Sequence, residues 1–188
     1  MSACRRDGRN AAPRADGSPM QPLPYLTGYA PEIIEQVRQL LADEKLGAWL
    51  LERYPETHQY RNEKALYDYA VELKNRYMRQ APALSKVVYD PRLHALHNAL
   101  GIHRKTSRIH GTRLSTRNEI RVATVFRKAP LPFLDMILIH ELAHLKETEH
   151  NRAFYQLCRH MASDYDQLEL DARLYLTYKE CVGELYGA

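Results

Sequence analysis

Apolar side chains recur at helical spacing in the first half of the chain. Pro31 is well placed at a first helical position, and the apolar residues after it share one face: Ile33, Ile34, Val37, Leu40 and Leu41. We expect Gly47 to bend or break this run before the apolar residues 49–51. A further helix should begin after Asn62, a good capping residue, and stop before Pro82. Both stripes are typical of helices that pack into a core.

Between residues 85 and 126 the pattern changes to that of strands. Residues 86–89 are typical of a short strand, and residues 119–126 alternate between a more apolar and a less apolar face. Residues 96–109 are ambiguous and could hold another strand, whereas residues 115–118 have the composition of a turn. We therefore expect a β-hairpin or a small meander in this region.

The most apolar stretch follows Pro130 and Pro132. From Phe133 to Leu145 the sequence is apolar nearly all round a helix, which predicts a buried helix. Another helix should begin near Asn151. The last helix is expected at residues 167–182, although the alternating leucines there also allow a strand.

Composition suggests how these elements are organised. Residues 1–24 contain four prolines and two glycines but few apolar residues, so they cannot bury enough surface to offset their ordering entropy. We expect a disordered tail at 1–24, a helical segment at 25–83 and the main domain at 84–188. A hydrophobic content of 45% and a charged content of 27% are ordinary for a globular protein and exclude a wholly disordered chain, a collagen or a simple coiled coil.

The net charge of +4 is too small to predict nucleic-acid binding by itself, but the charge is unevenly distributed. Residues 101–128 contain eight Arg or Lys and one acid. This basic segment is a candidate contact for nucleic acid or nucleotide, or simply a solvated face.

Cysteine usage and the N-terminus bear on location. The three cysteines, at positions 4, 158 and 181, form no CxxC pair, so neither a disulfide framework nor a cysteine zinc site is predicted. The N-terminal arginines are not followed by the apolar segment of a secretory signal, and no apolar run is long enough to span a membrane. We expect a reducing, cytoplasmic location and no membrane partner.

The sequence His140-Glu-Leu-Ala-His144 carries the strongest chemical signal. Residues four apart on a helix share a face, so two imidazoles placed there can bind one Zn²⁺. Glu141 is about 100° round the helix from His140, where it can reach a metal-bound water without ligating the metal. The alternative is a pair of hydrogen-bonded core histidines with a salt-bridged glutamate. That alternative is less favourable because burying these groups unpaired is costly.

A catalytic zinc site needs a third protein ligand and an open fourth position. His150 lies six residues after His144, which is not a same-face spacing, so it can serve only if the helix ends near Glu147 and the chain turns back. Asn151 as a cap for the next helix supports that reversal. Glu147, Glu149 and His160 are the rival ligands.

A family resemblance rests on these residues. His140 to His150, followed by Phe154-Tyr155, resembles the signature of the YgjP-like metallopeptidase domain, and Asp164-Tyr165 resembles a further recurrent element of that family. The similarity covers roughly residues 108–176, and residues 25–100 resemble the domain much less. Ile109 to Arg113 departs from the family pattern.

The resemblance implies an α+β fold: a small zincin-like domain, related to SprT-like peptidases, with an antiparallel sheet and an HExxH active-site helix. The helices before it would form an additional N-terminal segment. It implies Zn²⁺ as the cofactor, held by His140, His144 and His150, with Glu141 as the catalytic base.

The leading functional prediction is a zinc-dependent metallopeptidase. The alternatives are a metal-dependent nucleotide phosphohydrolase, an activity also proposed within the family, and a non-enzymatic zinc-stabilised module that binds nucleic acid or protein. In the phosphohydrolase, phosphates would meet basic residues of the segment 101–128: Arg104, Lys105, Arg108 and Arg113. A purely structural zinc site has no need of Glu141, so this carboxylate favours an enzyme. Residues that could assist as a second donor are Tyr155, Tyr165, Arg113 and His110, and Asp135 could orient a ligand imidazole.

Overall fold

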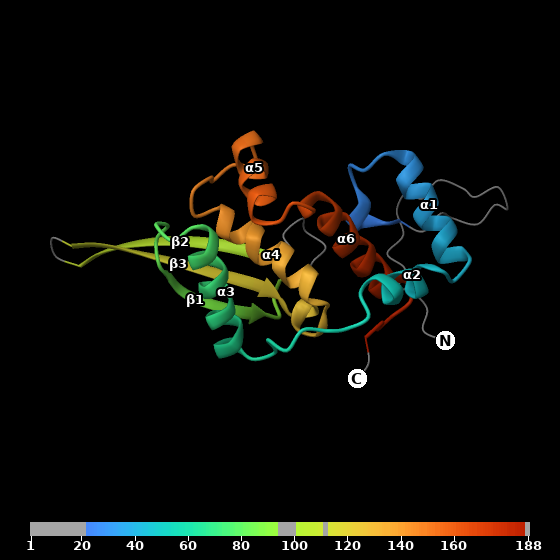
Figure 1. Ribbon diagram of the computed structural model, residues 1–188, viewed down its shortest axis with the longest axis horizontal. Coiled ribbons are helices and arrows are strands. Elements are labelled where there is room, and N and C mark those ends of the chain that lie inside the picture. The colour runs from blue at the N-terminus through green and yellow to red at the C-terminus, as the bar shows by residue number, and fades with distance from the viewer. Residues whose placement is uncertain (1–21, 94–100, 111–112, 187–188) are drawn as a thin grey trace. The chain divides into compact units, whose positions relative to one another are not determined.

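The computed structural model describes the backbone of residues 22–93, 101–110 and 113–186, and the side chains of residues 22–93 and 118–186. The expected tail at 1–24 lies almost wholly outside these residues. The described chain forms two compact units: residues 54–171, and the residues on either side of that range. Figure 1 shows the elements of each, and the helix α6 (Tyr165–Cys181) contributes to both.

A mixed three-stranded sheet forms the centre of unit 54–171. Its strands are β1 (Leu84–Asp90), β2 (Gly101–His110) and β3 (Arg113–Ala123), in the order β1-β3-β2. β1 runs parallel to β3, with Val87 opposite Ile120, whereas β2 and β3 are antiparallel from the pair Gly101–Val122 to the pair His110–Arg113. The α+β class is confirmed, but the expectation of an antiparallel sheet holds only for β2 with β3.

Three helices accompany this sheet: α3 (Glu63–Tyr77), α4 (Leu131–Ala143) and α5 (Arg152–Met161). α3 contacts β1, α4 contacts both β2 and β3, and α5 packs on α4 (Figure 1). Ile120 and Val122 of β3 are fully buried, and nine residues of α4 are buried. The helix that carries the candidate chemistry is therefore held firmly by the core.

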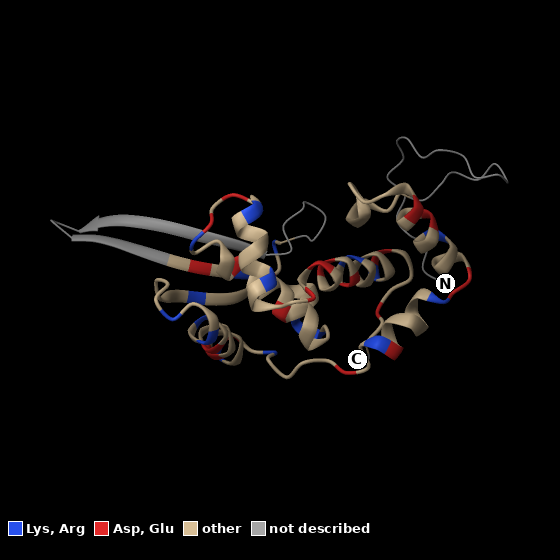
Figure 2. Ribbon diagram, turned by 45° about the horizontal axis from the view of Figure 1, so that its top comes forward, with Lys and Arg blue, Asp and Glu red and all other residues tan. Residues whose placement is uncertain are grey.

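The exposed surface of α3 is charged. Both basic and acidic residues lie along it (Figure 2), and two ion pairs join residues one turn apart, Lys64 with Asp68 at 2.6 Å and Arg76 with Glu72 at 2.8 Å. The side chain of Asn62 caps the helix by accepting a hydrogen bond from the Ala65 amide at 2.8 Å. Such exposed pairs add only a few tenths of a kcal/mol each, so burial of the inner face supplies most of the stability.

The second unit contains a short 3-10 helix η1 (Pro24–Leu26), α1 (Pro31–Ala42), α2 (Leu46–Arg53) and the later turns of α6. Gly47 is buried in α2, and a Cβ there would lie only 2.7 Å from a ring carbon of Tyr178 in α6. The absence of a side chain at Gly47 thus lets the Tyr178 ring approach the backbone of α2. Within the described residues, no helix is both long and apolar enough to cross a membrane.

Several local predictions are confirmed and others are wrong. The capped helix after Asn62 and the helical reading of the last segment agree with the structure. The break expected at Gly47 lies earlier, at residues 43–45 between α1 and α2, and Gly47 itself is part of α2. The strand expected at 119–126 ends at Ala123, and a 3-10 helix, η3 (Thr124–Lys128), follows it. Residues 115–118 form no turn, because cross-strand pairing with β2 incorporates them into β3. The division between 83 and 84 stays a prediction.

Candidate metal centre

Helix α4 presents the first two histidines of the candidate site. It begins after Pro130, and its second residue is Pro132, which suits the start of a helix because it lacks the amide hydrogen that would go unbonded there. It ends at Ala143, so that His140 lies in its last turn and His144 is its C-terminal cap. The helix ends about one turn earlier than the sequence predicted, and residues 145–147 continue as turns whose amides bond back to Leu142 and Ala143.

This early ending reverses the chain and returns His150 to the helix end. Asn151 then caps α5 by accepting a hydrogen bond from the Phe154 amide at 2.9 Å. The Nε2 atoms of His150 and His140 lie 3.0 Å apart. One potential ligand atom from each of His140, His144 and His150 lies within 4.8 Å of the others. The structure therefore brings together the three histidines named from the sequence.

The Nδ1 atoms of His140 and His144 each lie within hydrogen-bond distance of another protein group. Nδ1 of His144 lies 3.0 Å from the carbonyl oxygen of Glu147, to which it must donate, so Nε2 of a neutral His144 carries the free lone pair. Nδ1 of His140 lies 2.7 Å from the hydroxyl of Tyr165. Nε2 of His140 faces His150, and a hydrogen bond on the other ring nitrogen is the arrangement that metal-ligating histidines commonly show.

The spacing and chemistry of these donors fit a divalent metal such as zinc. With metal–nitrogen bonds of about 2.0–2.1 Å, two imidazole nitrogens of a tetrahedral site lie about 3.3 Å apart. The 3.0 Å between His140 and His150 is close to that value. His150 is exposed while the other two are half-buried, so the cluster is open to solvent on the His150 side.

Burial also favours the protonation state that a ligand needs. It lowers the pKa of His144, against the opposing effects of the Glu147 carbonyl and the charge of Glu149. His144 is therefore held in the neutral form, in which an imidazole can coordinate a metal.

A single aromatic ring supports all three histidines. The centroid of the fully buried Phe154 ring in α5 lies 4.9 Å from that of His140 and 4.7 Å from those of His144 and His150. In the sequence, Phe154 belonged to the aromatic pair that resembles the family signature, and no contact with the histidines was predicted for it. Its place four residues after His150, one turn into a capped helix, was the available signal.

Glu141 and Tyr165 are deeply buried beside this cluster. Glu141 is only 2% exposed, in the same turn of α4 as His140. Burial, and then the negative charge of Glu169, raise the pKa of Tyr165 far above its ordinary value, so its hydroxyl remains protonated. Burial likewise raises the pKa of Cys158 to about 12.

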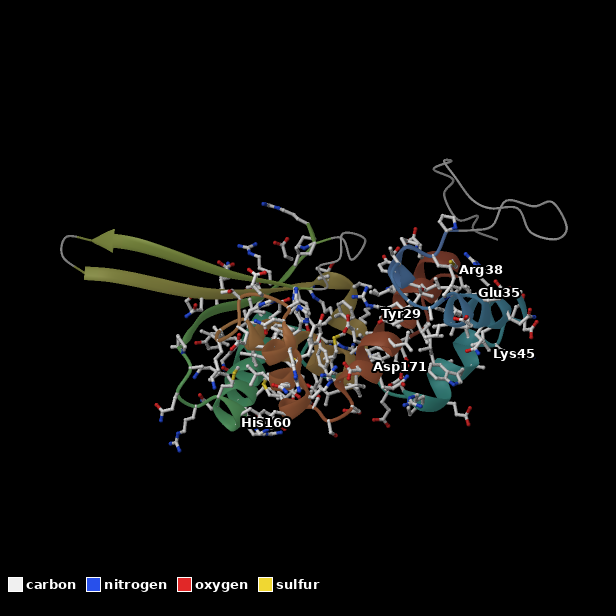
Figure 3. All side chains as sticks on the ribbon, turned by 90° about the horizontal axis from the view of Figure 1, so that it is seen from above. Tyr29, Glu35, Arg38, Lys45, His160 and Asp171 are labelled. Carbon is white, nitrogen blue, oxygen red and sulfur yellow. The ribbon has the colours of Figure 1, made fainter. Side chains whose placement is uncertain are left out.

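The structure also places several of the rival ligands and auxiliary residues named from the sequence. His160 lies at the end of α5 (Figure 3), with its ring centroid 6.4 Å from that of Tyr77, and the Glu147 contact to His144 comes from its carbonyl. Asp135 orients no imidazole in the structure but accepts a hydrogen bond from Tyr69. The Tyr155 ring lies 6.4 Å from that of His150.

Only part of the basic segment can be placed. Arg121 is bound by Asp90 at 2.7 Å and Glu119 at 2.6 Å, and Arg127 lies over the Tyr89 ring at 5.0 Å. The side chains of the four candidate phosphate contacts, Arg104, Lys105, Arg108 and Arg113, and of His110 lie outside the described residues.

Comparison with known proteins identifies the family. The YgjP-like metallopeptidase domain model matches residues 49–171. The chain belongs to the YgjP-like family. The match begins earlier than the resemblance at 108–176 suggested, and it includes α3 and β1.

A curated relative is consistent with this family assignment. The UTP pyrophosphatase of Escherichia coli (strain K12) is 56% identical over 158 residues, which cover 84% of this chain and 95% of that protein. No solved structure matches the chain. Family membership and the histidine cluster together support a metal-dependent hydrolase.

Proposed function

We propose that this protein is a zinc-dependent nucleoside triphosphate pyrophosphatase that acts on UTP, releasing pyrophosphate and leaving UMP. The observation that carries the proposal is the 56% identity to a protein named UTP pyrophosphatase, over 95% of its length. This reverses the order of the two enzyme predictions made from the sequence, where peptide hydrolysis came first. The candidate metal ligands and the candidate catalytic base are unchanged.

His140, His144 and His150 would hold the zinc through imidazole nitrogens. Three neutral imidazoles leave one coordination position for water or substrate, which is the usual form of a catalytic zinc site. Zinc bound there would supply Lewis acidity, lowering the pKa of a water and neutralising charge on a phosphoryl oxygen. The half-buried pair and the exposed His150 give substrate access from one side.

Glu141 would act as the general base. It follows His140 directly, so its side chain projects about 100° round α4 from that ligand. Its 2% exposure removes competing bulk water from the carboxylate. It would accept a proton from the water that attacks the α-phosphorus, while the bond between that phosphorus and the pyrophosphate oxygen breaks.

A triphosphate also requires positive charge beyond the metal. Residues 101–128 carry eight basic residues and one acid, and this segment forms β2 and β3, where β2 contacts the active-site helix α4. Because Asp90 and Glu119 already neutralise Arg121, the phosphates would be met by other basic residues of the segment.

Peptide hydrolysis remains the second candidate. It is favoured by the name of the family model and by the HExxH sequence, which serves a zinc peptidase with the same three histidines and the same base. The two candidates differ in the substrate site and not in the metal site.

The test compares UTP, the other nucleoside triphosphates and casein on one metal-analysed preparation. We expect UTP turnover that falls about 10²–10⁴-fold in Glu141→Gln while zinc and the fold are retained, because the amide cannot accept a proton. His150→Ala should lose zinc, whereas the matched His160→Ala should keep it. Casein cleavage without UTP turnover would overturn the substrate assignment. Stoichiometric zinc in His150→Ala would overturn the ligand set.

A further inference from the structure

Tyr165 makes a precise contact with the first candidate ligand. It is the first residue of α6, its side chain is 0% exposed, and its hydroxyl lies 2.7 Å from Nδ1 of His140. The two rings are inclined by only 19°, with centroids 6.5 Å apart. The Tyr165 amide bonds to the carbonyl of Ala162 at 3.1 Å, which fixes the short connection from α5. The hydroxyl is thus held by the backbone as well as by packing.

The single proton of a neutral imidazole decides the direction of this hydrogen bond. When Nε2 of His140 binds a metal, the proton must be on Nδ1, which then donates to the Tyr165 hydroxyl oxygen. We propose that Tyr165 is a positioning residue for the metal site: its hydroxyl selects the Nδ1-protonated form of His140 and aims Nε2 at the metal. This inference rests on the proposed metal site, and it is independent of the substrate.

The hydroxyl can accept from His140 only if its own proton points elsewhere. Cys158, fully buried in α5, interacts electrostatically with Tyr165. The Tyr165 hydroxyl can therefore direct its proton toward the Cys158 sulfur while it accepts from His140. In that arrangement the hydroxyl of α6 lies between a residue of α4 and a residue of α5.

The contact to His140 differs in kind from the contact to His144. A backbone carbonyl can only accept, so the Glu147 carbonyl fixes His144 in one form. A hydroxyl can donate or accept, so without metal the His140–Tyr165 pair can adopt either direction. In that state Nε2 of His140 can donate to Nε2 of His150, 3.0 Å away. Metal binding therefore selects one hydrogen-bond arrangement of the two.

The experiment removes the hydroxyl and keeps the ring. In Tyr165→Phe, Nδ1–H of a metal-bound His140 is left buried without its acceptor, so we expect zinc affinity to fall about 10–100-fold. The melting temperature of the metal-free protein should fall by no more than it does in the control. Affinity is measured by competition with a chromophoric chelator. The visible spectrum of the Co²⁺-substituted protein, which should change in the variant, reports the ligand geometry.

The matched control is Tyr175→Phe, the same substitution in the same helix at a residue that is 1% exposed. It should leave zinc affinity and the Co²⁺ spectrum unchanged. Unchanged affinity in Tyr165→Phe would overturn the proposal, and so would a lowered metal-free melting temperature with normal affinity, since that marks a merely structural hydroxyl. His150→Ala distinguishes the proposed metal site from the proposed role of Tyr165. If His150→Ala loses zinc while Tyr165→Phe binds zinc normally, the positioning role of Tyr165 is wrong and the metal site stands.

Discussion

Phe154 is the residue whose replacement best tests how the three histidines are held. Its ring lies within 4.9 Å, centroid to centroid, of each of the three imidazoles and is fully buried. Phe154→Leu keeps an apolar side chain but removes the flat surface that the imidazoles share. We therefore expect both the stability of the metal-free protein and its zinc affinity to fall.

The magnitude follows from the contacts. Each aromatic pair contributes about 0.5–1.5 kcal/mol beyond its buried area, and the three pairs share one ring, so their contributions are not fully additive. Adding a partly filled cavity, we expect the free energy of unfolding to fall by about 2–4 kcal/mol, somewhat less than a full truncation to alanine. At about 2–4 °C per kcal/mol for a chain of this size, the melting temperature should fall by roughly 4–16 °C.

The assay is thermal unfolding without metal, followed by zinc titration of the folded protein against a competing chelator. Zinc affinity should fall about tenfold or more, as it does when groups that orient metal ligands are lost. Phe126→Leu is the control, because Phe126 is equally buried but belongs to η3. It should lower the melting temperature and leave zinc affinity unchanged. Normal zinc affinity in Phe154→Leu would show that the ring only fills space.

Two further predictions concern buried polar groups outside the site. Burial lowers the pKa of His58 below its usual 6.5, against the opposing hydrogen bond to the Phe126 carbonyl, so the unfolded chain binds the proton more tightly. The stability that this group contributes is present above pH 6.5 and is lost as the pH falls through the folded-state pKa. Between pH 7.5 and 5.5, the melting temperature of metal-free His58→Gln should therefore fall less steeply than that of the unsubstituted protein. An unchanged slope would refute the assignment. Tyr69→Phe removes the hydroxyl that donates to half-buried Asp135 and should cost about 1–3 kcal/mol in urea unfolding. Tyr67→Phe, which loses a bond to the neutral carbonyl of Leu84, should cost less, and equal costs would contradict the role given to the carboxylate.

What could be read from the sequence is what neighbouring residues decide. The caps of α3 and α5 are hydrogen bonds between an asparagine and an amide three residues later, so Asn62 and Asn151 were sufficient signals. The placement of His140 and Glu141 in one buried helix follows from helical periodicity alone. Helical periodicity also predicted a chain reversal before His150, because residues six positions apart, such as His144 and His150, do not share a face of a continuous helix.

Tertiary structure decided the features that depend on distant segments. The parallel pairing of β1 with β3 joins residues more than thirty positions apart, and nothing in either strand specified its direction. Pairing with β2 also overrode the turn-like composition of residues 115–118. Local propensity is worth a few tenths of a kcal/mol per residue, which ladder hydrogen bonds and burial easily exceed.

The same division runs through the candidate site. The sequence by itself determined the ligand types and the HExxH spacing, since these are properties of one helical turn. The earlier end of α4, the approach of His150 to His140, the shared Phe154 ring and the Tyr165 contact were decided only by the packing of α5 and α6 beside α4. These contacts join residues 10 to 25 positions apart, and no periodic pattern reaches that far, because loops and helix ends set the directions in which the chain returns.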